Sequence, residues 1–307
     1  MMPSADRLTY LKLAVVSMIW GTTFVAGRYL AAEVDPLLAA TMRFVLASVA
    51  LLMFMAFTRV RLVRPRAGEC LQLAILGFFG IFFYNVCFFY GLHYINASRA
   101  SLIVALNPAV IGLASWLLFK ERLGAAKCLG IALCLGGAGA VIVSRNPQLL
   151  QGADTAWVGD LLILGCVLGW GVYSVCSRGL NHSLGPLQTV TWSIMLGTAM
   201  LTATTLVTGK LTVSAVSALH WPQLLSLLYL GVVGSALAYI AWYDGIRRIG
   251  ATRAGVFIAL NPLTAVVCGA LLLGEHLSLP MLLGGAVILL GIYLCNKPLA
   301  QPKPLGL

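Results

Sequence analysis

The side chain in this 307-residue sequence best suited to hold a small anion lies inside an apolar stretch. Arg43 follows Pro36 by seven residues, roughly 10 Å along a helix. A charged group at that depth in an apolar medium is costly and indicates a function. Its planar guanidinium could bind a substrate carboxylate through paired hydrogen bonds. Alternatively, it could bind backbone carbonyls and fix the ends of helices.

Two Trp-Gly pairs, one in each half of the chain, offer indole donors. Trp20-Gly21 is followed by Thr23, and Trp170-Gly171 by Tyr173. Glycine permits close approach of helices, while indole, hydroxyl and phenol groups can donate hydrogen bonds to a buried ligand. Helix packing alone explains these pairs equally well, so both interpretations stay open.

Aromatic residues are dense in the apolar stretch 70–92 and recur in 222–244. No single helix face could hold all of them, so we expect many to meet lipid. Tyr84, Asn85 and Tyr239 are the residues deepest in these stretches whose side chains can form hydrogen bonds. We therefore expect them to line a cavity inside the protein.

Asn107-Pro108 and Asn261-Pro262 lie near the middle of two further apolar stretches. Proline has no N–H, so the carbonyl four residues earlier loses its helical donor and the helix kinks. The kink could be static, with Asn bonded to a neighbouring helix, or it could be a hinge. Pro108 and Pro262 are the predicted gating hinges. The predicted substrate-binding residues are Trp20, Thr23, Arg43, Tyr84, Asn85, Asn107, Trp170, Tyr173, Tyr239 and Asn261.

Motifs for catalysis, metals and nucleotides are missing from the sequence. It contains no GxxxxGK[ST] loop and no HExxH, so we predict no cofactor, no metal site and no catalytic residue. Glu69, Asp160 and Asp244 all fall near the ends of apolar stretches. No carboxylate therefore lies in the middle of such a stretch, where a proton relay across it would need one. We therefore expect facilitated diffusion or exchange, or coupling through groups at helix ends.

The composition requires a lipid environment for the elements that carry these residues. Hydrophobic residues make up 60% of the chain, charged residues only 9%, and the mean hydropathy is +0.96. A soluble domain carries about 25% charged residues. The net charge of +11 is spread over short breaks between apolar runs, which argues against a nucleic-acid partner. The partners predicted are membrane lipid and a small-molecule substrate.

The sequence predicts an all-α membrane protein of ten transmembrane helices. Of its 20 basic residues, Arg99, Arg145 and Lys210 fall on one side, Arg28 and Arg43 lie inside spans, and all the others fall on the opposite side. The positive-inside rule then places both termini in the cytoplasm. Arg28, near a span end, is expected to snorkel to the surface. The spans are 11–31, 36–57, 70–92, 98–119, 124–143, 157–178, 186–207, 222–244, 253–273 and 280–296.

An internal repeat relates the two halves of the chain. Residues 91–123 align with 245–277 at an offset of 154, and both contain Ala-Leu-Asn-Pro. Earlier positions align at an offset of 150, including the two Trp-Gly pairs. Five spans is an odd number, so the halves must insert with opposite polarity around a central cavity, as in many secondary transporters. The predicted domains are 1–145 and 146–307.

Two further sets of repeated residues have structural explanations. Glu121 and Glu275 precede spans five and ten, where a carboxylate would stabilise a helix N-terminus. Glycines recur seven residues apart in those two spans, which favours close helix contacts. The contacts could join spans five and ten to each other or to a second subunit.

The ten spans, the Trp-Gly pairs, Pro36 followed by Arg43-Phe44, both Ala-Leu-Asn-Pro segments and the Glu after spans four and nine together resemble a known family. The sequence is similar, over nearly its whole length, to ten-helix metabolite exporters of the drug/metabolite transporter superfamily with two EamA-type domains. The resemblance implies export of small metabolites, often amino acids, through a central cavity of a bacterial inner-membrane protein. It also implies gating by spans four and nine.

The expected function is therefore that of a secondary transporter which exports small metabolites by alternating access, as a monomer or homodimer. The aromatic-rich third span favours amino acids, including aromatic ones. The alternative cargo is a drug or a nucleotide-linked sugar, although a sugar nucleotide would need several basic cavity residues besides Arg43. An enzyme would need a catalytic constellation, and none is visible.

Overall fold

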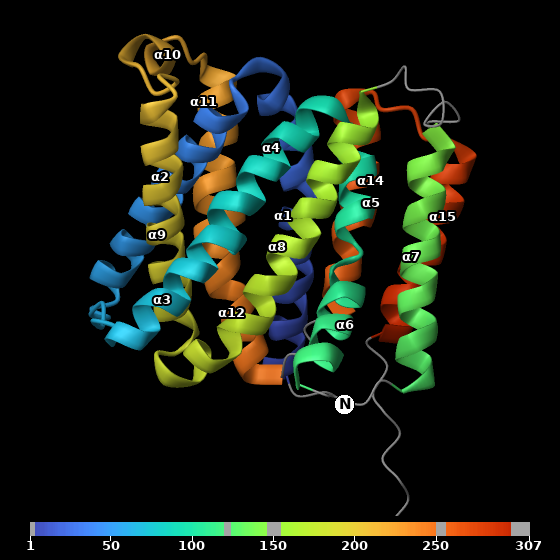
Figure 1. Cartoon of the computed structure of the whole chain (residues 1–307), viewed down its shortest axis with the longest axis horizontal. Coiled ribbons are helices and arrows are strands. Elements are labelled where there is room, and N and C mark those ends of the chain that lie inside the picture. Colours follow the sequence, from blue (N-terminus) through green and yellow to red (C-terminus); the bar gives the residue numbers. More distant parts are fainter. Residues whose placement is uncertain (1–3, 120–123, 146–154, 250–255, 296–307) are drawn as a thin grey trace, which may run out of the picture.

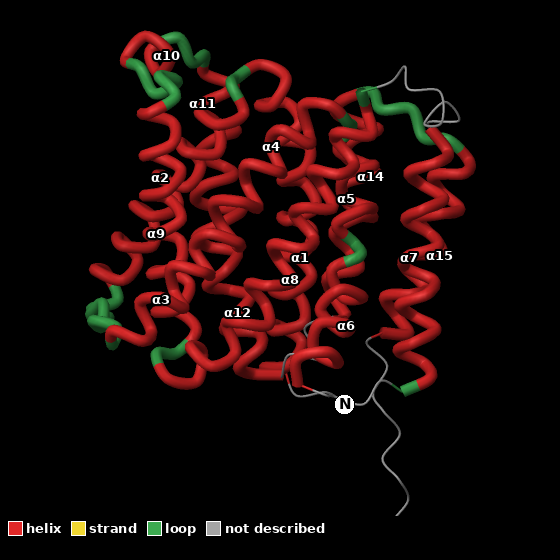
Figure 2. The backbone as a smooth tube through the Cα atoms, in the orientation of Figure 1, coloured by secondary structure: helices red, strands yellow, loops and turns green. Residues whose placement is uncertain are grey.

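A computed structural model describes residues 4–119, 124–145, 155–249 and 256–295, and helices make up nearly all of this part of the chain (Figures 1 and 2). The first half contains α1 (Ser4–Glu33), α2 (Pro36–Phe57), α3 (Ala67–Leu76), the π-helical η1 (Gly77–Phe83), α4 (Tyr84–Tyr94), α5 (Ala97–Val104), α6 (Asn107–Phe119) and α7 (Ala125–Arg145). The second half contains α8 (Ala156–Ser183), α9 (Pro186–Val207), α10 (Val213–Ser217), α11 (Trp221–Leu228), the π-helical η2 (Tyr229–Leu237), α12 (Ala238–Ile249), the 3-10 helix η3 (Val256–Ala259), α14 (Leu260–Leu273) and α15 (Leu279–Cys295).

Apolar helices occur at all ten predicted places. Seven helices in the described residues are long and apolar enough to cross a membrane, and they correspond to spans one to four and six to eight. The remaining three are shorter apolar helices, Ala125–Val141, Leu260–Leu273 and Leu279–Leu294, at the places of spans five, nine and ten. The all-helical ten-span fold is therefore confirmed.

Proline fixes the start of two repeat-related helices. Pro36 opens α2, and the Asp35 carboxylate accepts hydrogen bonds from the N–H groups of Leu37 (2.9 Å) and Leu38 (3.2 Å). Pro186 opens α9 in the same way, but Gly185 with φ of 82° precedes it and supplies no side-chain cap. Proline suits the first helical turn because its missing N–H has no partner there in any case.

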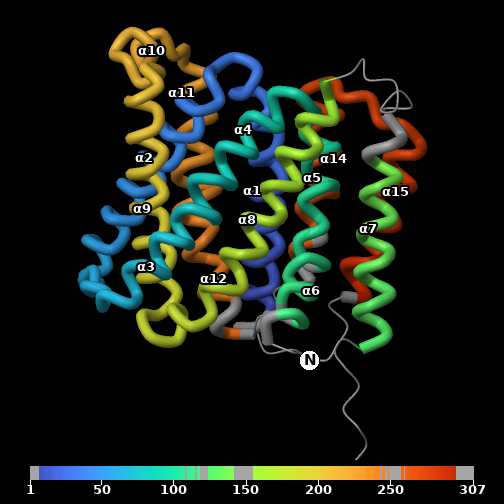
Figure 3. The backbone as a smooth tube through the Cα atoms, viewed as in Figure 1, coloured from blue at the N-terminus to red at the C-terminus, as the bar shows by residue number. Residues whose placement is uncertain are grey.

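The bundle has two ends, which we name for what lies there. The α10 face carries α10 and the α1–α2 connection at the top of Figure 1, and the N-terminal face carries the N-terminus and the α8–α9 connection at the bottom. Figure 3 shows the two halves interleaved rather than side by side: α1 packs against α12 and α14, and α8 packs against α4 and α6.

Close contacts between helices occur twice, once for each repeat. A Cβ added to Gly231 in η2 would lie 2.6 Å from the carbonyl oxygen of Arg43. A Cβ added to Gly77 in η1 would lie 3.0 Å from the carbonyl oxygen of Ser193, which is Arg43's counterpart at the offset of 150. Equivalent elements therefore meet in the same way twice between the halves, η2 with α2 and η1 with α9, as an inverted repeat requires.

Spans five and ten pair with each other. A Cβ on Gly137 of α7 would lie 2.8 Å from the carbonyl oxygen of Gly284, and one on Gly291 of α15 would lie 2.7 Å from that of Gly130. The glycine stripes thus let α7 and α15 pack backbone to backbone, which answers the question that the sequence left open.

Spans four and nine are irregular immediately before their Asn-Pro pairs. The helix is interrupted at Ala105 and Leu106, between α5 and α6, and in the second half η3 gives way to α14 at Leu260. The predicted break is therefore present in span four, although the Pro108 side chain lies outside what the structure describes. Movement at either site stays a prediction.

Candidate functional site

A buried polar cluster forms around Arg43, which is only 7% exposed. Its Nε donates to Ser235 Oγ of η2 (3.3 Å), and its Nη1 donates to Asn85 Oδ1 of α4 (3.3 Å). Asn85 is held in turn because its Nδ2 donates to the carbonyl of Ile81 (2.8 Å). We call Arg43, Asn85 and Ser235 the arginine cluster.

The charge of Arg43 has no counter-ion within the described residues. A guanidinium carries five N–H donors, and two hydrogen bonds to neutral side chains leave donors for a further acceptor. The rings of Phe44 and Phe88 lie 5.2 and 5.6 Å from its Cζ and offer only weak compensation. The interpretation in which Arg43 holds backbone carbonyls is wrong, because its hydrogen bonds go to side chains.

Five aromatic side chains from four elements form a second group beside it. The ring of Tyr239 lies 5.8 Å from that of Trp20 and 6.2 Å from that of Trp170. Trp170 also lies 6.0 Å from Tyr84 and 5.3 Å from Tyr173. The repeat-related indoles of Trp20 and Trp170 therefore both pack against the phenol ring of Tyr239. We call these five residues the aromatic cluster.

The two clusters adjoin each other. Tyr84 and Asn85 are neighbours on α4, Ser235 precedes Tyr239 by one helical turn, and both phenols lie within electrostatic range of Arg43. The structure therefore brings together seven of the ten predicted substrate-binding residues, on α1, α2, α4, α8 and α12.

The other three predicted residues occupy different surroundings. Thr23 donates to the carbonyl of Trp20 (2.6 Å), and its methyl group packs where Gly234 leaves room. The amide oxygens of Asn107 and Asn261 are enclosed and have no hydrogen-bond partner among the described residues. Asn261 lies at the close approach of α14 to Gly21 of α1. Asn261 therefore lies beside the Trp20-Gly21 pair and makes no hydrogen bond to Arg43.

A second polar group ties the repeats together at the α10 face. Arg99 at the start of α5 donates through Nε (2.7 Å) and Nη2 (2.5 Å) to Asp160 of α8, and these side chains are 3% and 4% exposed. Glu275 accepts from the N–H groups of Ala97 (2.8 Å) and Ser98 (3.0 Å). We call these contacts the α10-face lock.

These contacts change two expectations. Arg99 is a buried ion-pair partner rather than a residue in a surface break, and Glu275 caps α5 of span four rather than span ten, which it precedes. Arg28, which is only partly buried, reaches the end of α4, where its Nη1 donates to the carbonyl of His93 (2.8 Å) and to that of Leu92; its snorkelling to the surface stays a prediction. Charges near span ends here satisfy helix termini of other spans.

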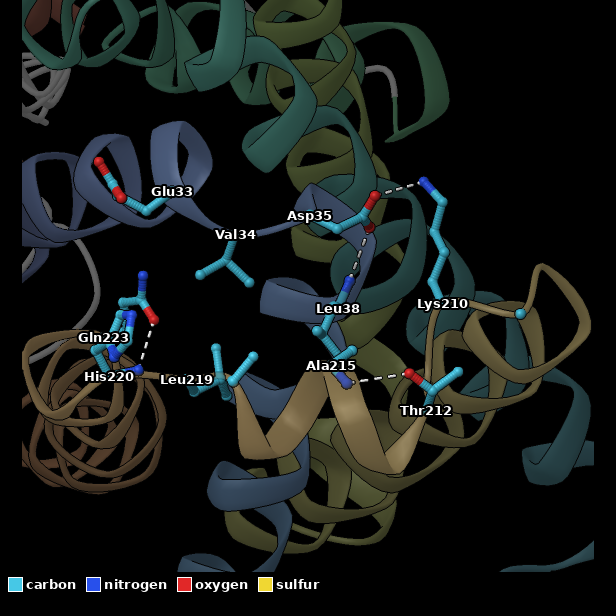
Figure 4. A pocket seen from close by; sticks show the side chains of 12 residues that line it. Glu33, Val34, Asp35, Leu38, Lys210, Thr212, Ala215, Leu219, His220 and Gln223 are labelled. Carbon is cyan, nitrogen blue, oxygen red and sulfur yellow. Dashed lines mark hydrogen bonds and ion pairs between the residues drawn. The ribbon is translucent and has the colours of Figure 1, made fainter.

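The α10 face also carries a pocket of about 450 Å³ (Figure 4). Val34 and Leu219 point into its middle, while Glu33, His220 and Gln223 lie on one side and the Asp35–Lys210 ion pair (2.6 Å) on the other. Hydrogen bonding to Asp35 raises the pKa of Lys210 above its ordinary value. None of the predicted substrate-binding residues lines this pocket.

Sequence reasoning missed Ser235 and the two π-helical turns. Ser235 is the hydrogen-bond partner of Arg43, and its Oγ also donates to the carbonyl of Leu230 (2.9 Å) within η2. A signal was present, because Gly77 and Gly231 stand 154 residues apart, the offset of the repeat. π-helical turns often occur at functional sites.

The family model for the EamA-like transporter family matches the chain twice, at residues 7–143 and 157–297. The uncharacterized transporter YyaM of Bacillus subtilis is 26% identical over 295 residues, covering 96% of this chain and 95% of that protein. An uncharacterized transporter of Archaeoglobus fulgidus is 29% identical, covering 93% and 96%. The proteins of this similarity group are named as transporters and not as enzymes.

Two more comparisons bear on cargo and on fold. A protein of Streptantibioticus cattleyicolor named "Probable terminal-alkyne amino-acid exporter" is 27% identical over 257 residues, covering 83% of this chain and 82% of that protein. A solved crystal structure with 21% sequence identity superposes with a TM-score of 0.67, covering 93% of this chain and 94% of the other. At that identity the structural likeness shows the fold alone.

Proposed function

We propose, from the premise that this chain belongs to the EamA-like transporter family, that it exports small carboxylate-bearing metabolites, foremost amino acids, through a central chamber. The chain is a membrane-integral transporter. The cargo is our inference. One relative is named as an exporter of an amino acid, which supports that choice without deciding it.

The observation that carries the proposal is the unpaired charge of Arg43. A cation buried in a bundle of apolar helices is costly unless an anion neutralises it. Within the described residues no carboxylate does so. A transported carboxylate would supply the missing charge, and the spare N–H donors of the guanidinium fit its two oxygens.

The alternative cargoes fit the same site less well. A nucleotide-linked sugar carries more than one negative charge, whereas the other deeply buried guanidinium, Arg99, is already neutralised by Asp160. A cationic drug would meet Arg43 as a like charge. The aromatic cluster suits an amino acid with an apolar or aromatic side chain.

The inverted repeats support alternating access as the mechanism. Two halves with one backbone plan and opposite polarity can exchange shapes at similar energy. We propose that the irregular stretches before Asn107-Pro108 and Asn261-Pro262 are the hinges. The domain boundary at 145/146 falls beside residues outside the described part of the chain, and it stays a prediction.

We further propose a bacterial inner-membrane location, cytoplasmic termini and a monomer or homodimer. The excess of basic residues on the side of the termini supports their cytoplasmic placement, and the bacterial inner membrane is what the family resemblance implies. Both repeats lie in one chain, so a monomer can enclose the chamber, and a homodimer would place two such chambers side by side.

Counterflow in proteoliposomes tests the cargo. Vesicles loaded with one unlabelled amino acid at a time should accumulate the labelled form, with and without a pH gradient. Arg43→Gln should reduce this uptake by roughly tenfold or more, because a charged hydrogen bond contributes about 1.5–3 kcal/mol. Arg43→Lys keeps the charge but lacks the planar guanidinium, so its uptake should lie between that of Arg43→Gln and that of the unaltered protein. If no amino acid is taken up by the unaltered protein, the proposed cargo is wrong.

A further inference from the structure

The two repeats place different side chains at the positions that form the arginine cluster. The offset of 150 puts Ser193 at the place of Arg43, and the offset of 154 puts Tyr239 at the place of Asn85 and Ile81 at the place of Ser235. Ser193 Oγ lies 3.3 Å from the hydroxyl of Tyr173, so the second copy of this place is neutral and partly aromatic. The two repeat-related places are therefore chemically different although their backbones are symmetric.

The two chemistries lie at different depths in the bundle. Arg43 is seven residues from the end of α2 at the α10 face, and Asn85 is nine residues from the corresponding end of α4, which is roughly 10–14 Å by helical rise. Tyr173 and Tyr239 are each ten residues from the helix ends at the N-terminal face. Trp170 lies midway along α8, and Tyr84 bridges the two groups.

We propose that the chamber binds its substrate in one orientation, with the carboxylate toward the α10 face on Arg43 and the side chain against Trp170, Tyr173 and Tyr239. This inference rests on the proposed function, and it names what that function leaves open. The carboxylate is the group that the two ends of the site treat most differently, because among the described residues of the two clusters only Arg43 is a cation.

The neighbours of Arg43 make this end specific for an anion. Asn85 Oδ1 and Ser235 Oγ hold two N–H groups of the guanidinium and fix its plane. The remaining donors could pair with both oxygens of a carboxylate, which an ester or an amine cannot match. The aromatic rings at the other end offer apolar area and π faces that tolerate many side chains.

The roles of the two ends should separate in competition experiments. Counterflow of a labelled amino acid would be competed by the same amino acid, by its methyl ester and by the amine that lacks the carboxylate. The unaltered protein should prefer the free acid by roughly tenfold or more over both analogues. Arg43→Gln should remove most of that preference. Trp170→Phe and Tyr239→Phe should keep it and instead change the ranking of amino acids with different side chains.

Thermal unfolding in detergent provides a second readout for variants that transport poorly. Free acid should raise the unfolding temperature of the unaltered protein and of Tyr239→Phe, but not that of Arg43→Gln. Equal competition by the ester in the unaltered protein would overturn the orientation while leaving amino-acid transport intact. Failure of all amino acids would instead overturn the proposed function, and the acid-against-ester preference could then be measured with other small carboxylates.

Discussion

The two halves of this transporter agree where backbones touch and differ at two charged positions, Arg43 and Asp160, although Arg99 and Glu275 recur as Arg253 and Glu121. Gly77 and Gly231 occupy equivalent close contacts, and both Trp-Gly pairs lie in the core of the bundle. By contrast, Arg43 has Ser193 as its counterpart, and the Asp160 of the α10-face lock has Tyr10. On the proposed mechanism, the shared contacts would serve the exchange of shapes, and the unshared Arg43 and Asp160 would serve recognition and locking.

This division has a physical reason. Alternating access needs two states of similar energy, so the packing surfaces that slide or hinge must be alike in both halves. A substrate is not symmetric, so the groups that hold it need not be. A lock that favours one state over the other must likewise contain an unshared residue, here Asp160, because equal locks at both faces would cancel.

The largest effect should come from removing Asp160, the unshared member of the α10-face lock. Asp160→Asn removes the carboxylate that neutralises the buried Arg99 guanidinium, and such a loss costs about 3–5 kcal/mol. The free energy of unfolding, measured by SDS titration in mixed micelles, should fall by that amount. The matched change at the repeat-related position, Tyr10→Phe, should alter it by less than about 0.5 kcal/mol.

A double variant distinguishes an unpaired charge from lost packing. Arg99→Met with Asp160→Leu removes both charges, so most of the stability should return. If this variant is as unstable as Asp160→Asn, the ion pair is not what makes the position sensitive. If Tyr10→Phe costs as much as Asp160→Asn, the contrast between the halves is wrong.

The sequence predicted the shared part of the molecule far better than the unshared part. The spans, the repeat and the break in span four follow from local signals, namely apolar length, repeated motifs and a proline without an N–H. The Arg99–Asp160 pair and the cap of α5 by Glu275 join residues 61 and about 178 positions apart, and nothing local marks them. Arg28 illustrates the same point. Its place near a span end predicts a side chain that reaches the surface, but nothing in the sequence indicates that its hydrogen-bond partners are carbonyls of α4.

The site divides in the same way. Seven predicted residues meet, because the repeated Trp-Gly pairs and the deep polar groups of spans two, three and eight are visible in the sequence. Ser235 was missed because a serine in an apolar run has no distinguishing mark. The π-helical turns were missed because they depend on close packing against α2 and α9, which the glycines permit but do not specify.

A middle-sized effect should test the shared contacts. Gly231→Ala and Gly77→Ala each place a methyl group at 2.6–3.0 Å from a backbone oxygen of α2 or α9, and such overpacking costs about 1–3 kcal/mol. Both should lower the free energy of unfolding. Gly231→Ala should also weaken carboxylate binding, because the oxygen that it displaces belongs to Arg43. Gly77→Ala faces Ser193 and should leave that binding unchanged.

Gly139→Ala on α7 is the control, since a methyl group there meets no atom within 4 Å. It should be neutral or slightly stabilising, because alanine favours helices by up to about 1 kcal/mol over glycine. Equal losses of carboxylate binding in Gly231→Ala and Gly77→Ala would show that the two ends of the chamber share the anion.

The smallest effect should come from a second unshared contact, the Asp35–Lys210 pair of the α10 face. Both side chains are about one-third exposed, so solvent screens the pair and its contribution should stay below about 1 kcal/mol. The pKa of Lys210 is raised in the folded state, so this contribution is complete below the unfolded pKa of lysine and is lost as pH rises through the folded value. Unfolding temperatures of the unaltered protein and Lys210→Met should therefore differ slightly at pH 8 and converge toward pH 11. A difference that instead grows with pH would mean that Lys210 is stabilised by its uncharged form, and that the α10 face holds no second charged tie beside the lock.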